Sequence, residues 1–412
     1  MSKIRILAIP SDNHGVGKFR MLDPFTYIGD KFSSDVHVDI VFNVPNEDNY
    51  FSNYDIVVFH SFIHKTSHEE NVKRIKWLKL NGIKVIADTD DFWKTDHRHP
   101  NHETFKKNQL ARKRSELLRL ADYITTTTPV YRDTIKKLLG VDNVMVFPNA
   151  VNDEDKQFQP KPLESDMVRF GWLGGSSHEH DLSLMGDGIS RVHREFKGKA
   201  QFVLCGFDLR GTMRELNRHT GETTERPIRP DETAWSRYES LFTGNDTSLS
   251  PEYNAYLKTY TKGSFEGELD QPYVRRWTMD INKYANNYNY FDVSLAPLVK
   301  SDFNVNKSQL KVIEAGFHKK AIIASEENPY LIDLISSIEK GGGINPKGNS
   351  LLVSSNKNHK QWHQQMKRLI NNPNMVTDLG EKLYETVKDK YSLSTVSKNR
   401  VEFFKSIINK NQ

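Results

Sequence analysis

Two lysines and a glutamate recur at helical spacing within the segment 301–330. Lys307, Lys311 and Glu314 are four and three residues apart, so the spacing predicts that they share one face of a helix over 307–316. Two ammonium groups beside the electropositive start of a helix favour an anion such as a diphosphate. Glu314 lies one turn beyond Lys311, where its carboxylate can accept hydrogen bonds from a ribose diol. The alternative interpretation is an ordinary helix face with internal salt bridges.

Three carboxylates stand close together in the sequence DTDDFW, at the end of a predicted strand over 84–90. Asp88, Asp90 and Asp91 repel one another at this spacing. At least one of them is therefore expected to have a raised pKa or a cationic partner. Two alternatives stay open: Asp88 and Asp90 as a metal-binding Asp-x-Asp pair, and the block as the N-terminal cap of a helix.

Glycine-rich turns follow two of the predicted strands, in the sequences NHGVG and GWLGGSSH. Glycine lets backbone N–H groups approach a phosphate or a sugar without a clash from Cβ. A histidine in such a turn is a candidate donor to a phosphate oxygen. A simple tight turn and a structural histidine are the competing interpretations. The candidate residues in these turns are His14, Gly15, Gly17, Gly174, Gly175, Ser176 and His178.

A basic segment occupies the predicted helix over 103–121. Its cations are opposed only by Glu103 and Glu116. Such a run is usually the solvated face of an amphipathic helix. The functional alternative is an acceptor-side patch for a phosphate-bearing substrate, a membrane surface or a nucleic acid. The cations are Lys106, Lys107, Arg112, Lys113, Arg114 and Arg119.

Short apolar runs alternate with helical patterns in both halves of the chain, which predicts parallel sheets covered by helices on both faces. Ligands of such sheets bind at the carboxyl ends of the strands. The predicted strands cover 4–10, 36–42, 55–60, 84–90, 123–128, 144–149, 168–174, 201–207, 291–298, 321–325 and 351–355. The predicted helices include 69–81, 103–121, 129–139, 182–196, 307–316, 360–371 and 375–390.

Three segments depart from this alternation. The polar segment 153–166 contains Pro160 and Pro162 and is a linker candidate. The polar segment 208–272 is predicted to be an insertion in the second half with helices of its own, since a structureless connection of this length is unusual. The end of the chain, 392–412, has apolar residues at helical spacing.

The composition is that of a soluble globular protein with two domains. The chain has 412 residues, a formal net charge of +5 and a single cysteine, Cys205. One cysteine excludes an internal disulfide and a cysteine-based zinc site, and its apolar surroundings predict a buried thiol. No window is apolar enough to span a membrane, and the start of the chain is expected to be a strand rather than a signal peptide. A cytoplasmic location is expected.

Taken together, these blocks resemble the GT-B glycosyltransferases, especially glycosyltransferase family 4. The resemblance is carried by KSxxKxxE at 307–314 with the strand and Pro-Tyr turn after it, by GVGKFR after the first strand, by DTDD, by the FPNAVN junction at 147–152 and by GWLGGSS. The chain departs from the family in having Ala150 and Asn152 in place of the common Gly and Asp and an Asp-Asp pair in place of a single His or Asp, and at two points of the donor site. Asn306 stands where the family has the first glutamate of an acidic pair, and no Arg…Lys pair follows Gly174.

The resemblance implies a GT-B fold, α/β with two Rossmann-like doubly wound domains facing a central cleft. The implied division is an acceptor domain over 1–152, the linker 153–166, a nucleotide-sugar donor domain over 167–391 with the insertion, and a C-terminal helix over 392–412 that crosses back to the first domain.

The implied activity is retaining transfer of a hexosyl or pentosyl group from a nucleotide-sugar, expected to be a UDP-sugar, to an acceptor hydroxyl. Asp90, Asp91 and Lys311 are the implied catalytic residues. No metal, tightly bound cofactor or membrane span is expected, and a homo-oligomer is possible. The implied donor-binding residues are Lys307, Lys311, Glu314 and Asn306 together with those of the two glycine turns.

Three hypotheses for the acceptor and activity stay open. The first is a bacterial glycan or lipid-linked intermediate as acceptor. The second is a phage enzyme that glycosylates hydroxymethylated bases in DNA, in the cytoplasm of an infected host. The third is a sugar-nucleotide-binding protein without activity, which the missing glutamate and the missing Arg…Lys pair favour.

Overall fold

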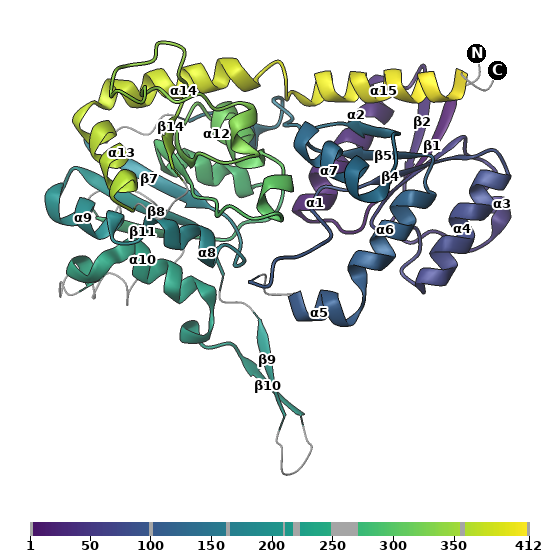
Figure 1. Cartoon of the computed structure of the whole chain (residues 1–412), viewed down its shortest axis with the longest axis horizontal. Coiled ribbons are helices and arrows are strands. Elements are labelled where there is room, and N and C mark those ends of the chain that lie inside the picture. Colours follow the sequence, from purple (N-terminus) through teal and green to yellow (C-terminus); the bar gives the residue numbers. More distant parts are fainter. Residues whose placement is uncertain are drawn as a thin grey trace. The chain divides into compact units, whose positions relative to one another are not determined.

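The structure is a computed structural model of the chain, drawn in Figure 1. It describes residues 3–98, 102–161, 165–208, 211–216, 223–248, 271–354 and 359–409.

Two compact units make up the fold, and each contains one six-stranded parallel sheet. The first unit comprises Met1–Phe158, Lys300–Glu314 and Glu385–Gln412, and the second comprises Gln159–Val299 and Ala315–Tyr384. The prediction of an α/β protein with two Rossmann-like sheets is confirmed.

The strands of the first sheet are short and mostly apolar. β3, Ile56–His60, is buried along its whole length, which is typical of a parallel sheet covered on both faces. The strand order is β2-β1-β3-β4-β5-β6, so the order of the strands reverses direction between β1 and β3. The other strands are β1 Ile4–Ile9, β2 Val36–Ile40, β4 Lys84–Asp88, β5 Tyr123–Thr126 and β6 Val144–Val146.

The helix predicted over 103–121 is two helices, α5 His102–Lys107 and α6 Leu110–Leu120. The break is at Gln109, whose φ of 53° is left-handed and cannot continue an α-helix. α1, Gly15–Gly17, follows β1 and continues through a π-helical turn, Lys18–Leu22, into α2, Asp23–Lys31. The other helices that follow strands of the first sheet are α3 Asp48–Phe51, α4 His68–Leu80 and α7 Pro129–Leu139.

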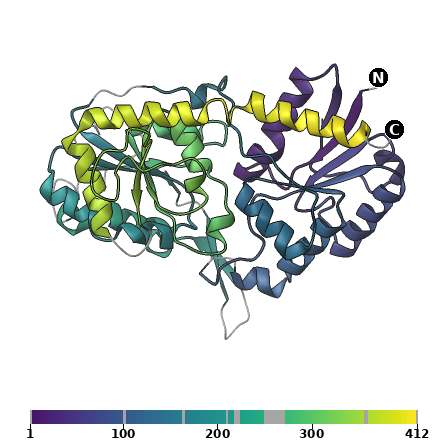
Figure 2. The same ribbon diagram turned by 45° about the horizontal axis from the view of Figure 1, so that its top comes forward.

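The last helix, α15 Leu393–Asn409, packs on the first sheet. Val401 and Phe404 are buried in one apolar cluster with Phe25 of α2 and Ile6 of β1. The rings of Phe25 and Phe404 stack with their centroids 6.0 Å apart. Figures 1 and 2 show α15, in yellow, running alongside α2. The apolar spacing at the end of the sequence is therefore the face of α15 that covers this sheet.

The second sheet has the order β11-β8-β7-β12-β13-β14. Counted along the chain, this is the order 3-2-1-4-5-6 of the dinucleotide-binding fold, with its reversal between β7 and β12. Gly171 in β7 lies against the ring of Phe291, where a Cβ would come within 2.0 Å of the ring, so only glycine fits. The strands are β7 Val168–Leu173, β8 Ala200–Phe207, β11 Tyr273–Trp277, β12 Val293–Ala296, β13 Ala321–Ser325 and β14 Leu351–Val353.

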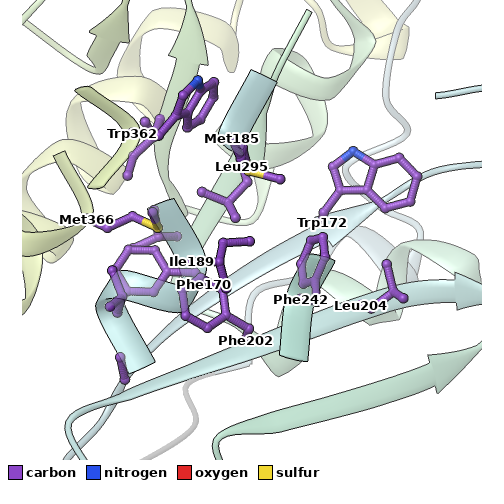
Figure 3. Packing of buried hydrophobic residues seen from close by; sticks show 14 of the residues in the cluster. Phe170, Trp172, Met185, Ile189, Phe202, Leu204, Phe242, Leu295, Trp362 and Met366 are labelled. Carbon is purple, nitrogen blue, oxygen red and sulfur yellow. The ribbon is translucent and has the colours of Figure 1, made fainter. Parts of the chain in front are cut away.

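Aromatic side chains fill the core between this sheet and its helices, as Figure 3 shows. Phe170 and Phe202 stack across neighbouring strands with ring centroids 5.5 Å apart, and Trp362 and Met366 enter from α13, His359–Asn371. The remaining helices are α8 Glu179–Leu182, α9 Gly188–Glu195, α10 Ala234–Ser248, α12 Leu310–Phe317 and α14 Pro373–Val387.

The segment predicted as an insertion, 208–272, contains both a hairpin and a helix. β9 Thr212–Leu216 and β10 Thr223–Pro227 pair antiparallel and extend from the second unit (Figure 1). α10 carries Trp235 and Phe242 into the core, so the prediction that this segment forms a helix of its own is confirmed. Residues 249–270 lie outside the described residues.

Two predictions from composition are also tested by the structure. Cys205 in β8 is fully buried, as predicted, and burial raises the pKa of its thiol to about 12. No helix in the part of the chain that the structure describes combines the length and the apolar character needed to span a membrane.

Substituting Phe404→Ala is expected to lower the free energy of unfolding of the first unit by about 3 kcal/mol, because it empties a packed position that is 1% exposed. Amide hydrogen exchange reports each unit separately, so faster exchange is expected in β1 and β3 and not in β8. Lys398→Ala, an exposed position on the same helix, is the control and is expected to change little. Equal amide exchange rates in β1 and β3 of the two variants would contradict the role given to α15.

Candidate functional site

The candidate site lies where the strand order of the first sheet reverses, at the carboxyl ends of β1 and β3. A crevice for a ligand forms at such a point because the two flanking loops leave in opposite directions. Ser11 follows β1 and His60 ends β3. Ser11 Oγ and His60 Nδ1 lie 2.7 Å apart, so a hydrogen bond joins the two strand ends.

His60 is held between two carboxylates. Ser11 Oγ donates to Asp12 Oδ2 at 2.6 Å, and His60 Nε2 lies 3.1 Å from Asp90 Oδ1. Because an ionised carboxylate only accepts, Nε2 donates to Asp90. The contacts with Ser11 and Asp90 together fix the orientation of the imidazole.

Asp88 is neutralised inside the first unit. Arg20 donates to both of its oxygens, from Nε at 2.9 Å and from Nη2 at 2.7 Å, and both side chains are fully buried. Burial alone would raise the pKa of Asp88, but the charge and hydrogen bonds of Arg20 hold it below its usual value. With both oxygens occupied, Asp88 is not available for the Asp-x-Asp metal pair. Among the residues that the structure describes, no group of three or more His, Cys, Asp or Glu side chains is placed to hold a metal ion.

Asp90 and Asp91 are neighbours with opposite pKa shifts. Burial disfavours the charge on Asp90, yet the hydrogen bond and charge of His60 lower its pKa. Burial and the charge of Asp90 raise the pKa of Asp91 to about 6, against the opposing charges of Lys307 and Arg114. The prediction of a raised pKa or a cationic partner in this block is confirmed, since Asp91 has a raised pKa and Asp88 has Arg20 as its cationic partner.

A cavity of about 290 Å³ opens at these side chains, close to the lower limit for small-molecule sites. We call it the His60 cavity. Asp91 and Arg114 line it, and Arg114 Nη2 donates to Ser61 Oγ at 2.7 Å. Trp93 also lines it, and its buried Nε1 has no hydrogen-bond partner among the described residues. A buried donor of this kind is normally satisfied by water or by a ligand.

The first glycine turn forms the first turn of a helix, α1. Gly17 packs so closely on Asp12 that a Cβ would come within 1.9 Å of the Asp12 carbonyl oxygen, so this position requires glycine. Asp12 Oδ1 accepts from the backbone N–H groups of His14 at 2.9 Å and Gly17 at 3.2 Å. These two donors are thus already occupied by a carboxylate, whereas Gly15 has open space around it.

Lys307 lies outside the helix, so the prediction that it shares a helix face with Lys311 is wrong. α12 begins at Leu310, and Lys307 has an extended backbone with φ −70° and ψ 166°. The physical reason is a tertiary hydrogen bond, in which Asn149 Nδ2 donates to Ser308 Oγ at 3.0 Å and holds the loop before the helix. Lys307 Nζ lies 5.0 Å from the centroid of the Phe303 ring.

The remaining residues of this motif are placed as follows. Lys311 and Glu314 lie in α12, where Glu314 is buried. Asn306 ends a 3-10 turn, Asn304–Asn306, and its Nδ2 donates to the carbonyl oxygen of Asp302 at 2.6 Å. The buried Asn306 Oδ1 has no hydrogen-bond partner among the described residues.

The second glycine turn follows β7 at the point where the second sheet reverses. Gly174, Gly175 and Ser176 lie in the turn before α8. His178 Nδ1 lies 2.8 Å from Asp181 Oδ2, and Asp181 Oδ1 accepts from the Val299 N–H at 2.8 Å. Asp181 thus fixes the orientation of the imidazole and joins the turn to the segment after β12.

Four side chains of the His60 cavity did not emerge from the sequence patterns. Ser11 and His60 are 49 residues apart, and only the adjacency of β1 and β3 brings them together. Arg114 is one cation of a basic run, and Trp93 follows the aspartates in DTDDFW, so neither pattern predicts a place in this cavity. The available signal was the position of Ser11 and His60, polar residues at the carboxyl ends of two apolar runs that predict strands.

Comparison with known proteins rests on the fold. No family model matches the chain, and no curated protein is similar to it. Among solved structures, that of Anabaena HepE in complex with UDP-glucose covers 98% of this chain and 100% of its own, with a TM-score of 0.57 at 10% identity. The chain has the GT-B fold.

Two further solved structures have the same architecture. A putative UDP-N-acetylglucosamine 2-epimerase from Listeria monocytogenes covers 99% of this chain and 98% of its own, with a TM-score of 0.54 at 10% identity. A point mutant of TarM from S. aureus, in complex with fondaparinux, alpha-GlcNAc-glycerol and UDP, covers 92% of this chain and 58% of its own, with a TM-score of 0.50 at 11% identity. At these identities the likeness establishes the fold alone.

The Asp91 carboxyl is expected to titrate near pH 6 in carboxyl-carbon NMR spectra of the folded protein. Lys307→Met is expected to move the midpoint higher, because Lys307 favours the charged form. Since the native pKa exceeds the unfolded value of about 4, the stability that Asp91 contributes is complete below that pH and is lost as the pH rises through about 6. A midpoint below 4 in the unsubstituted protein, or no response to Lys307→Met, would contradict this account of the cluster.

Proposed function

We propose that this protein is a glycosyltransferase that moves a sugar from a nucleotide-sugar, a UDP-sugar, to an acceptor hydroxyl. The observation that supports this most strongly is the His60 cavity. It combines a part-buried His60–Asp90 pair, an Asp91 carboxyl with a pKa of about 6 and an indole N–H without a partner among the described residues. The GT-B fold, which the chain shares with HepE in its UDP-glucose complex, supports the same donor.

In the proposed reaction the bond between the anomeric carbon and the diphosphate oxygen breaks, and a bond from the acceptor oxygen to that carbon forms on the same face. The acceptor proton passes to the departing diphosphate. Stabilising the negative charge of the leaving group is the main catalytic requirement. Lys311 and Lys307 supply this charge stabilisation, and Glu314 binds the ribose.

The remaining candidate residues have positioning roles in this proposal. Asp90 and Asp91 accept hydrogen bonds from sugar hydroxyls, and His60 keeps Asp90 ionised and oriented. The N–H groups of Gly174, Gly175 and Ser176, together with His178, are further donors to the diphosphate.

The acceptor can be a glycan, a lipid-linked saccharide or DNA with hydroxymethylated bases. The DNA alternative requires cations that can contact phosphates, and the basic run of the sequence lies on α5 and α6. Arg112 and Glu116 form an ion pair with a nitrogen–oxygen distance of 3.5 Å, and Arg119 Nε donates to the Leu139 carbonyl oxygen at 3.2 Å. Lys106 and Lys107 are exposed on α5. Fewer cations are thus available for phosphates than the run in the sequence indicates.

The test is UDP release from a panel of UDP-sugars, with and without each acceptor class, with the mass of donor and acceptor read in parallel. UDP release that depends on one acceptor, with a matching gain in its mass, is the expected result. His60→Ala, Asp91→Asn and Lys307→Ala are expected to lower kcat/KM by about a hundredfold or more, because each removes a charge or donor from the site. Lys398→Ala on α15 is the control and should keep full activity.

Other outcomes exclude the proposal in distinct ways. Donor binding without turnover would identify a sugar-nucleotide-binding protein. Conversion of the donor to its epimer without acceptor gain would identify an epimerase. Donor affinity that is the same in Lys307→Ala and Lys311→Ala as in the unsubstituted protein would contradict the assigned donor site.

A further inference from the structure

A second cavity lies in the first unit beside the His60 cavity. Its volume is about 610 Å³, well within the range of small-molecule sites. Phe92 and Phe303 line both cavities, so the two cavities share an aromatic wall. We call it the basic cavity.

The lining of the basic cavity has an excess of positive charge. Arg98 and Asp96 offset each other, with Nε and Nη2 of Arg98 lying 2.8 Å and 3.2 Å from the two carboxylate oxygens. Lys94 and Lys137 are exposed and form no hydrogen bond or ion pair with the residues that the structure describes. Two exposed lysines in the lining of one cavity favour an anion there. The charged residues of the lining are Lys94, Asp96, Arg98, Lys137, Lys300 and Asp302.

A buried acceptor atom without a partner lies in the same lining. Asn306 is 2% exposed, its Nδ2 is used by the Asp302 carbonyl oxygen, and its Oδ1 has no partner among the described residues. Buried amide oxygens are normally hydrogen-bonded. A ligand that brings a hydroxyl group to Asn306 would satisfy this atom, so the cavity suits a molecule with both an anionic group and a hydroxyl.

We infer that the basic cavity binds a small phosphorylated saccharide or polyol, with its phosphate at Lys94 and Lys137 and a hydroxyl at Asn306. The identification of this molecule as the acceptor rests on the proposed function, whereas the phosphate preference does not. A concave cavity of this size favours a small molecule over a nucleic acid, which is bound along an extended basic surface.

The experiment is calorimetric titration of the full-length protein with UDP kept saturating, so that the diphosphate site is occupied. The probes are glucose 6-phosphate and glycerol 3-phosphate, each compared with its unphosphorylated form, and a short single-stranded oligonucleotide. The phosphorylated probes are expected to bind about tenfold tighter or more than their neutral forms, which corresponds to about one charge-assisted hydrogen bond. Lys94→Ala/Lys137→Ala is expected to abolish this preference.

Lys340→Ala/Lys347→Ala is the matched control, because it removes the same charge from exposed positions of the second unit that line neither cavity. Acylation of lysines followed by mass spectrometry locates the probe, and protection is expected at Lys94 and Lys137 but not at Lys340. The inference is overturned if no phosphorylated probe binds, if the preference survives in the Lys94/Lys137 variant, or if only the oligonucleotide protects these lysines. Failure to bind UDP would instead count against the proposed function.

Discussion

The buried ion pair between Arg20 and Asp88 is the constraint on which the arrangement of the first unit depends. Two charges taken out of water are stable only when their hydrogen-bonding groups are all used. Arg20 comes close to this condition, since all three of its nitrogens donate: Nε and Nη2 to Asp88, and Nη1 to the Phe147 carbonyl oxygen and to Asn149 Oδ1. Thr125 Oγ1 also donates to Asp88 Oδ2 at 2.6 Å. Removing one member would leave a buried charge uncompensated, a loss of about 3–5 kcal/mol.

This ion pair also links separate parts of the chain. Asp88 ends β4, so fixing it fixes the start of the loop that carries Asp90 and Asp91. Asn149, held by Arg20, in turn donates to Ser308 and fixes the loop that carries Lys307. Arg400 of α15 is buried beside the pair, where burial and the charge of Arg20 lower its pKa to about 9. Arg20, Thr125 and Arg400, which are far apart in the sequence, thus all act on one buried carboxylate.

The charge pattern of the candidate site follows from this arrangement. Arg20 neutralises Asp88, whereas the other two carboxylates of the DTDD block, Asp90 and Asp91, line the His60 cavity together with Asp12. His60 keeps Asp90 ionised, and Asp91, with burial and a charged neighbour against it, is poised to gain or lose a proton near pH 6. His60 therefore favours the ionised, hydrogen-bond-accepting form of Asp90, while Asp91 changes its charge near pH 6.

The fold was predictable because the buried strands are apolar along their length and helices separate them. β3 and β13 could be placed from such runs alone. β11 was not predicted because its sequence YVRRW contains two arginines and therefore lacks the continuous apolar run of a central strand. His60 was missed because its role depends on the order of the strands, which periodicity does not report. Lys307 was misplaced because a long-range hydrogen bond from Asn149 overrides its helical spacing.

The most direct test of the account is a crystal structure of the protein with a UDP-sugar analogue in which carbon replaces the anomeric oxygen. The account predicts that the sugar lies in the His60 cavity, with hydroxyl groups hydrogen-bonded to Asp90 and Asp91, and that the diphosphate contacts Lys307 and Lys311. A sugar bound elsewhere, with the His60–Asp90 and Ser11–His60 hydrogen bonds unchanged and no ligand in the cavity, would contradict it.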